Sequence, residues 1–319
     1  MSGEVIVVGG GVSGLTTAVE LAERGHRVRV RSAEESARTT SAVAGGLWWP
    51  YRIEPKEQVA RWAVESLGVY EELASDPGET GVRLVPGVAV GRAADGLGPW
   101  AAALGQLRPA RPEELPSGHT EGVWARVPLV DMPVQLAWLR RRLEAAGGSV
   151  EPGTVTSLTE LSRTVPTVVN CTGLGARELV PDPGVRPVRG QLVLVENPGI
   201  EEWLTLADDE GSRSTYLMPQ PGRLILGGTA EEDDWRREPD AATAAAIVAR
   251  CALYHPAVAT ARVLGHRVGL RPVRPAGVRI EAEQLPGGGL VVHNYGHGGA
   301  GVTVAWGCAR AAAALVPPV

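Results

Sequence analysis

Residues 4–32 read EVIVVGGGVSGLTTAVELAERGHRVRVRS, and three patterns follow one another in this stretch. Residues 5–8 are a continuous β-branched run, as in a strand buried on both faces of a parallel sheet. Apolar residues from Leu15 to Ala22 then recur at helical spacing, and Gly25 is placed to end the helix. Val28 and Val30 alternate with arginine, as in a second strand. The order predicts a βαβ unit at the start of an α/β fold.

The turn between the first strand and the helix has the spacing G-x-G-x-x-G. Its first glycine allows a tight turn, the second lets the backbone approach a pyrophosphate, and the third brings helix against strand. The helix amino end offers N–H groups and partial positive charge to phosphates. The sequence therefore predicts a dinucleotide site formed by Gly9, Gly11, Val12, Ser13 and Gly14.

One position departs from the usual pattern. About 20 residues after the glycines, an Asp or Glu normally binds the ribose hydroxyls, but Ser32 stands there. Ser32 is therefore a candidate cofactor contact, with Glu34 and Glu35 as alternatives. The motif alone does not choose between NAD and FAD, since both present a pyrophosphate.

Bulk composition narrows the class of protein. A chain of 319 residues exceeds the usual size of a single core, which predicts two domains. The net charge of −5 argues against a nucleic-acid or anionic-membrane surface. There is no basic signal-peptide start, no apolar run near 20 residues and no peroxisomal tripeptide, and three scattered cysteines suit a reducing compartment. We expect a cytoplasmic protein.

Residues 38–51, RTTSAVAGGLWWPY, favour FAD, because small and hydroxyl residues before bulky ones suit a backbone laid against a flat ring system. With this stretch the sequence resembles the D-amino-acid oxidase family of FAD-dependent flavoproteins. The resemblance covers the whole chain and includes VVNCTGLGARELVPD, RGQLVLVENPG, STYLMPQPGRLILGGT, VGLRPVRP and HNYGHGGAGVTVAWGCA.

The resemblance implies FAD as cofactor and assigns further contacts to it. It places part of residues 40–47 in the flavin-binding segment, Val155 in a short strand GTVTSL near the adenine, and residues 172–173 in a second cofactor turn. The glycine-rich loop 296–303 would lie over the pyrimidine end of the flavin and lead into a helix. The implied residues are Thr40, Ser41, Gly45, Gly46, Leu47, Val155, Thr172, Gly173, Gly296, Gly298, Gly299, Gly301, Val302 and Thr303.

The resemblance also implies the reaction. Arg271 would hold the substrate carboxylate through two parallel hydrogen bonds, Tyr216 would add a third contact, and the Gly299 carbonyl would accept from the amine. Hydride transfer from the Cα of a neutral or basic D-amino acid to the flavin would give the imino acid, which hydrolyses to the 2-oxo acid and ammonia. Oxygen would reoxidise the flavin, giving hydrogen peroxide. Trp49 and Tyr51 could line the substrate cavity or pack against the proline between them.

The predicted architecture is a discontinuous Rossmann-like FAD-binding domain with a second, substrate-binding domain on a largely antiparallel sheet. Residues 1–50, 131–176 and 269–319 would form the first domain, with a helix in 133–146, and residues 51–130 and 177–268 the second. The alternating segments QLVLVE and RLILGG predict antiparallel strands in the second domain.

Other functions stay open at this stage. A D-aspartate oxidase needs extra positive charge, which Arg213 could supply; against it, Ala230 stands where that relative has an arginine, and the acidic run 231–234 would repel a dianion. A glycine or sarcosine oxidase and a non-catalytic nucleotide-binding protein are further alternatives. His293 and His297 have a metal-ligand spacing, but glycines interrupt any helix there, so no metal is expected. The expected partners are a D-amino acid and oxygen, without nucleic acid or membrane. The resemblance allows a homodimer, but no segment of the sequence marks an interface.

Overall fold

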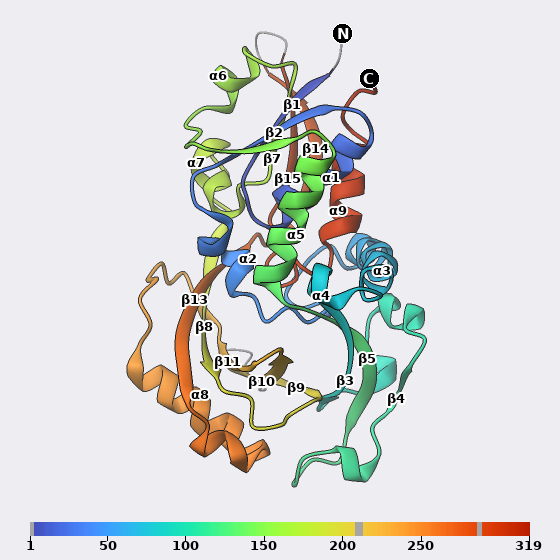
Figure 1. Cartoon of the computed structure of the whole chain (residues 1–319), viewed down its shortest axis with the longest axis vertical. Helices are drawn as coiled ribbons and strands as arrows, with labels where there is room; N and C mark the ends of the chain where they lie inside the picture. Colours follow the sequence, from blue (N-terminus) through green and yellow to red (C-terminus); the bar gives the residue numbers. More distant parts are fainter. Residues whose placement is uncertain (1–2, 208–212, 286–288) are drawn as a thin grey trace.

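The computed structural model describes residues 3–207, 213–285 and 289–319. Its strands form two sheets, one above the other in Figure 1, and both chain termini lie at the end formed by the first sheet. The first sheet has six strands in the order β14 (Arg279–Gln284), β15 (Leu290–Tyr295), β7 (Thr167–Asn170), β1 (Glu4–Val8), β2 (Arg27–Ser32) and β6 (Ser149–Pro152).

The first sheet is parallel except where β14 meets β15. The βαβ prediction is confirmed: residues 5–8 lie in β1, the helix is α1 (Val12–Glu23), and β2 pairs with β1. Gly25 follows the helix with a φ of +93°, a conformation that favours glycine. Three segments far apart in the sequence meet in this sheet: β1 with β2, β6 with β7, and β14 with β15. The motifs at the two ends of the chain require this arrangement.

The second sheet is larger and mostly antiparallel, as predicted. Only β3 and β9 run parallel to each other among its paired described strands. The predicted strands QLVLVE and RLILGG lie in β8 and β11, which are antiparallel neighbours. Its order is β12 (Glu231–Glu232), β8 (Arg186–Val195), β11 (Arg223–Thr229), β10 (Arg213–Gln220), β9 (Trp203–Ala207), β3 (Val82–Val90), β5 (Gly122–Val130) and β4 (Leu107–Pro109), and β13 (Val263–Val273) also pairs with β8.

Helices cover the outer faces of both sheets. In the first half of the molecule α1 packs against α5 and α9; in the second, α8 packs on β8, β10 and β11. Ile247 and Cys251 of α8 are fully buried there. The remaining bounds are α2 (Thr40–Val43), α3 (Lys56–Leu73), α4 (Pro77–Thr80), α5 (Met132–Ala145), α6 (Leu158–Ser162), α7 (Ala176–Leu179), α8 (Ala241–Tyr254) and α9 (Ala305–Ala313).

Two expectations about the elements differ from the structure. Val155 does not lie in a strand: β6 ends at Pro152, and residues 153–157 form a loop before α6. The reason is that β2, the partner of β6, ends at Ser32, so no strand edge remains to pair with residues 153–157. The expected domain boundary between residues 268 and 269 falls inside β13, which runs unbroken along β8. The division into domains stays a prediction.

Ion pairs fix the end of β13 to the first sheet. The Arg274 guanidinium donates to the Asp182 carboxylate at 2.8 Å and to the Gly277 carbonyl at 3.0 Å, and the Tyr295 hydroxyl donates to the same carboxylate. Burial raises the pKa of Asp182, but these hydrogen bonds outweigh it and hold the pKa below its usual value. The ionised carboxylate therefore links β13, β15 and the segment after α7.

We predict that Arg274→Ala lowers the free energy of unfolding by about 1–3 kcal/mol, because Asp182 then loses a charged donor in a half-buried place. Urea unfolding monitored by circular dichroism measures it. Arg262→Ala is the control, since its pair with Glu196 is exposed, and it should cost under about 1 kcal/mol. Equal losses in the two variants would contradict a structural role for the Arg274 pair.

Candidate active site

The turn after β1 is packed too tightly for side chains. Gly9 has a φ of +118°, and a Cβ built there would lie 2.4 Å from the Cys171 carbonyl oxygen. A Cβ on Gly14 would lie 1.9 Å from the Gly9 oxygen. These glycines let the amino end of α1 approach β7, which leaves the backbone of the turn exposed to a cavity between the two sheets.

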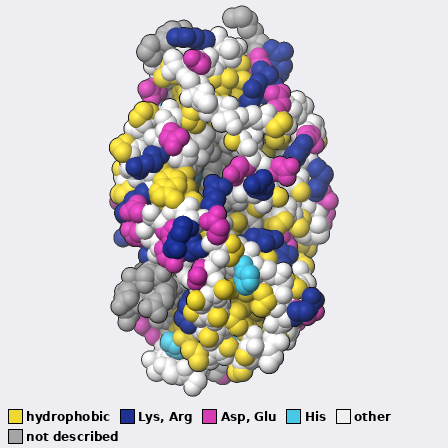
Figure 2. Space-filling model, turned by 90° about the vertical axis from the view of Figure 1, so that its left-hand side faces the viewer, with side chains coloured by type: hydrophobic (Ala, Val, Ile, Leu, Met, Phe, Trp, Pro, Cys, Tyr) yellow, Lys and Arg dark blue, Asp and Glu magenta, His cyan; other side chains and the backbone are white. Residues whose placement is uncertain are grey.

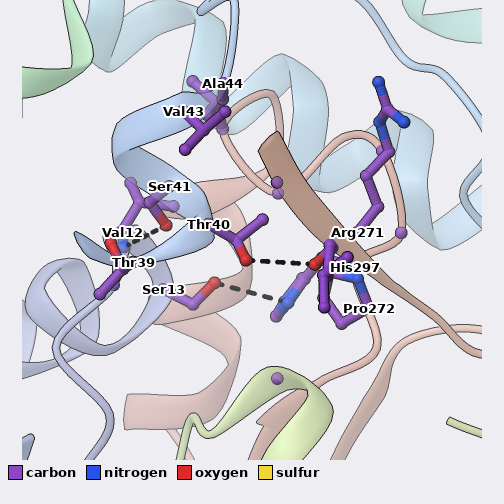
Figure 3. Close-up of a pocket in the computed structure, with 18 of the residues that line it drawn as sticks. Val12, Ser13, Thr39, Thr40, Ser41, Val43, Ala44, Arg271, Pro272 and His297 are labelled. Carbon is purple, nitrogen blue, oxygen red and sulfur yellow. Dashed lines mark hydrogen bonds between the residues drawn. The ribbon is translucent and has the colours of Figure 1, made fainter. Parts of the chain in front are cut away.

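Hydroxyl side chains fix the next segment of this cavity. Figure 3 shows the Ser41 hydroxyl accepting from the Val12 N–H at 2.9 Å, at the amino end of α1. The Thr40 hydroxyl donates to the Leu270 carbonyl of β13 at 3.1 Å. Residues 40–41 thus lie between α1 and β13 and are bonded to both, so the predicted flavin-binding segment has a fixed position.

The glycine-rich loop reaches the same cavity from the other side. Gly298 has a φ of +53°, its N–H donates to the Pro272 carbonyl, and a Cβ there would lie 2.2 Å from the Arg52 oxygen. His297 bridges to Val273 and is almost fully buried. The loop leads into α9, as predicted.

His297 is a neutral residue of this loop. Its Nε2 lies 2.9 Å from the Asn294 side-chain oxygen, and its Nδ1 lies 3.4 Å from the Ser13 hydroxyl (Figure 3). Burial lowers its pKa to about 4. Among the described residues, no group of three or more His, Cys, Asp or Glu side chains is arranged to hold a metal ion.

Arg271 and Tyr216 lie together on the second sheet. The Arg271 guanidinium covers Gly190 of β8, where a Cβ would stand 2.4 Å from Nη1, and donates to the Thr229 carbonyl at 3.0 Å. The Tyr216 ring covers Gly227 of β11 in the same way. Burial raises the pKa of Tyr216, while the nearby Arg271 charge opposes part of that rise. The tyrosine is therefore a protonated hydroxyl beside a cation.

A cavity of about 740 Å³ brings the predicted residues together. Two of them do not line it: Gly14 packs inside the turn, and Gly296 faces Arg274. Those that do line it are Gly9, Gly11, Val12, Ser13, Ser32, Thr40, Ser41, Gly45, Gly46, Leu47, Val155, Thr172, Gly173, Tyr216, Arg271, Gly298, Gly299, Gly301, Val302 and Thr303.

Sequence reasoning did not identify one wall of the cavity. Trp49 and Tyr51 both line it, and the Trp49 ring also packs against Trp100 and Trp203. A substrate contact by either residue stays a prediction. The further wall comes from β3, β9 and β10. On β10 the sequence singled out only Arg213 and Tyr216, and β3 and β9 gave no motif to detect. Their alternation would have marked an inward face, without showing that the face meets a ligand. The residues of this wall are Ala89, Val90, Arg92, Thr205, Leu206, Ser214 and Met218.

The acidic run 231–234 is not the repulsive feature that the sequence suggested. Its four carboxylates pair with arginines: Glu231 with Arg189, Glu232 and Asp233 with Arg186, and Asp234 with Arg236. None of the four lines the cavity. The expected repulsion of a dianionic substrate is therefore wrong, because these charges are compensated outside the site. Arg213 begins β10, but its side chain lies outside the described part of the structure.

The cavity fits FAD by its shape and by the chemistry of its wall. Its volume lies within the usual range of cofactor sites. One end has glycine backbone at a helix amino terminus, which suits a pyrophosphate. The wall also has small residues at 44–46 and at 298, 299 and 301, where a flat ring can meet backbone N–H groups.

Comparisons with known proteins agree with this geometry. A family model described as FAD dependent oxidoreductase (DAO) matches residues 4–315. A D-amino-acid oxidase of Streptomyces coelicolor is 63% identical over 314 residues, covering 98% of this chain and 96% of the relative. The human D-aspartate oxidase is 35% identical over 325 residues, covering 98% and 94%. Glycine oxidase from Geobacillus kaustophilus has the same fold, with a TM-score of 0.81, 20% identity and coverage of 98% and 95%.

We predict that Gly11→Ala weakens FAD binding roughly tenfold or more, the scale of a 1–3 kcal/mol steric penalty. A Cβ at Gly11 would lie 2.9 Å from the Ser41 oxygen and would disturb the hydroxyl that holds Val12. Fluorescence titration of the apoprotein with FAD measures the dissociation constant. Gly68→Ala, in the open on α3, is the control and should bind as wild type. A Gly11 variant that also binds as wild type would refute close backbone approach at this turn.

We also predict that burial of His297 makes the protein acid-sensitive. Between pH 6.5 and about 4 the unfolded chain binds a proton that the folded protein does not, so the free energy of unfolding falls as pH falls. From pH 7 to 4.5 wild type should lose roughly 2–3 kcal/mol more than His297→Gln. Denaturant unfolding at both pH values measures this, with exposed His266→Gln as the control. The same pH dependence in wild type and His297→Gln would contradict a buried neutral imidazole.

Proposed function

The chain belongs to the family of FAD-dependent oxidoreductases, and we propose that it is a D-amino-acid oxidase. The observation that carries the proposal is the pairing of Arg271 with Tyr216 in the wall of the cavity. The 63% identity to a D-amino-acid oxidase over nearly the whole chain supports it.

Arg271 is suited to receive the substrate carboxylate. A guanidinium carries five N–H donors in a planar fork, and the Thr229 carbonyl takes one of them. The others can form two parallel hydrogen bonds with a carboxylate. Gly190 beneath the guanidinium keeps the fork flat against the sheet and open to the cavity.

Tyr216 and Gly299 give the substrate two further contacts. The Tyr216 hydroxyl keeps its proton, because burial raises its pKa, and can donate to the carboxylate. The Gly299 carbonyl can accept from the substrate amine; Tyr51 packs against Gly299, with 2.7 Å between its ring and the position of a Cβ there. Three fixed contacts leave one enantiomer with its Cα–H directed at the ring site.

When bound, FAD supplies the two-electron acceptor that no side chain provides. The net reaction oxidises the amine to an imine and reduces oxygen to hydrogen peroxide, and water then hydrolyses the imine. The protein residues need only hold the amine unprotonated and in place, so no side-chain base is required. Neutral or basic D-amino acids are the proposed substrates, since the wall from β3, β9 and β10 is mostly uncharged.

A second candidate, D-aspartate oxidase, is favoured by one observation. Arg92 lines the cavity just after β3, where Val90 pairs with Leu206 of the same wall. A cation there could meet a second carboxylate. The identity to a D-aspartate oxidase is lower, at 35%, and Ala230 is buried and lines no part of the cavity.

A substrate panel tests the proposal. The purified yellow protein should release peroxide from D-alanine and D-methionine and not from their L-enantiomers, with little from glycine or sarcosine. Peroxide measured by a coupled peroxidase assay gives the ranking. A strong preference for D-aspartate would favour the second candidate, and a colourless protein that rejects FAD, or activity on L-amino acids, would overturn the proposal.

Arg271→Lys should lower kcat/KM for D-alanine by the equivalent of about 2–5 kcal/mol, because an ammonium cannot make the two-pronged contact. Steady-state kinetics at saturating FAD measures the change. Arg267→Lys, on the same strand but bonded only to the His266 carbonyl in the described structure, is the matched control. Similar kinetics in both variants would refute the carboxylate assignment.

A cytoplasmic location is part of the proposal and is supported by the three cysteines, which are buried free thiols. Among the described residues, no helix is both long and apolar enough to cross a bilayer. A homodimer stays a prediction, which the elution volume of the purified protein would test.

A further inference from the structure

An ion pair joins the two halves of the molecule in the wall of the cavity. The Arg237 guanidinium donates to the Glu34 carboxylate at 2.7 Å, although 203 residues separate them. Glu34 follows β2 of the first sheet, and Arg237 follows β12 of the second. Both residues line the cavity, at the end that also includes Ser32 and residues 153–156. Figure 2 shows basic and acidic side chains alternating around a hollow at mid-height of one face.

Arg237 is held in place by buried side chains of β8. Arg189 is 2% exposed and donates to the carbonyls of Arg236 and Glu238, one on each side of Arg237. Gln191 binds both the N–H and the carbonyl of Asp240. The backbone around Arg237 is therefore fixed to the second sheet, so the reach of Arg237 toward Glu34 is built into the fold.

Ser32 does not have the freedom to take the role of the missing acid. Its hydroxyl donates to the Glu34 carbonyl at 2.6 Å and is buried. A Cβ on Gly10 would lie 2.4 Å from that hydroxyl, so Ser32 is packed against the turn. Glu34 is then the nearest carboxylate after β2 on the cavity wall, at the end where a ribose is bound in this kind of fold.

We propose that Glu34 and Arg237 form a clamp on the adenosine ribose of FAD, with Glu34 accepting from a ribose hydroxyl and Arg237 orienting its carboxylate. A lone carboxylate near a pyrophosphate would be repelled, and the Arg237 charge offsets this. Because the partners belong to different sheets, the clamp also joins the two halves of the molecule across the cofactor. The inference rests on the family's cofactor and is independent of the proposed substrate.

The test measures how fast FAD leaves the holoenzyme. After dilution into FAD-free buffer, the rise of free-flavin fluorescence gives the dissociation rate for Glu34→Gln, Arg237→Gln and the double variant. Arg236→Gln is the matched control, because Arg236 is adjacent to Arg237 in the sequence, but its guanidinium pairs with Asp234 and does not line the cavity. Far-UV circular dichroism checks that each variant is folded.

Arg237→Gln should speed FAD release about two- to fivefold, the scale of an ion pair whose side chains are 61% and 37% exposed. Glu34→Gln should speed it about tenfold, because it also removes the charged acceptor for the ribose. The double variant should match Glu34→Gln, since the two residues act as one unit. Arg236→Gln should match wild type.

An FAD analogue that lacks the 2′-hydroxyl of the adenosine ribose adds a second readout. It should leave wild type faster than FAD does, and leave Glu34→Gln at the same rate as FAD. Release rates for Glu34→Gln and Arg237→Gln that equal the Arg236→Gln rate, or effects that multiply in the double variant, would overturn the clamp. FAD release rates do not depend on catalytic turnover, so a failure of this proposal can be distinguished from a failure of the proposed function.

Discussion

The site depends on one contact that a side chain would prevent: the Arg271 guanidinium lies over Gly190 of the neighbouring strand. Glycine inside a strand is unfavourable, because it loses entropy and packs nothing. The second sheet nevertheless has glycine at 190 and 227. The space that side chains would take there is filled by Arg271 over Gly190 and by Tyr216 over Gly227. The surface of the sheet is therefore flat at these two glycines and carries the positive charge of Arg271.

The strand that carries Arg271 is also bonded to the segments expected around the flavin. Thr40 donates to the Leu270 carbonyl, and the Gly298 N–H donates to the Pro272 carbonyl. Arg271 therefore lies between two residues whose backbones are tied to opposite walls of the ring site. If Arg271 is the carboxylate receptor as proposed, one strand sets its distance from the cofactor, and the orientation of the substrate does not depend on a mobile connection between the two sheets.

The sequence predicted the parts of this arrangement that have a local pattern. The βαβ unit and the antiparallel strands follow from periodicity and turn residues, whereas the glycine loop that leads into a helix was implied by the family resemblance; the structure has all three. Val155 was wrongly expected in a strand. A strand there would need β2 to pair with, but β2 ends at Ser32, and the sequence around Val155 does not show where β2 ends. The acidic run 231–234 was misjudged because two of the arginines that pair with it, Arg186 and Arg189, lie more than 40 residues away in the sequence. Arg237 gave no signal at all, since its position depends on buried hydrogen bonds from another strand.

A crystal structure of the FAD-loaded protein with an aryl carboxylate that has no α-hydrogen tests the central claim most directly. The account predicts both carboxylate oxygens about 2.9 Å from guanidinium nitrogens of Arg271, with the Tyr216 hydroxyl on one of them and the ligand facing the flavin ring. A carboxylate bound elsewhere in the cavity, for example at Arg92, with Arg271 still bonded only to Thr229, would contradict it.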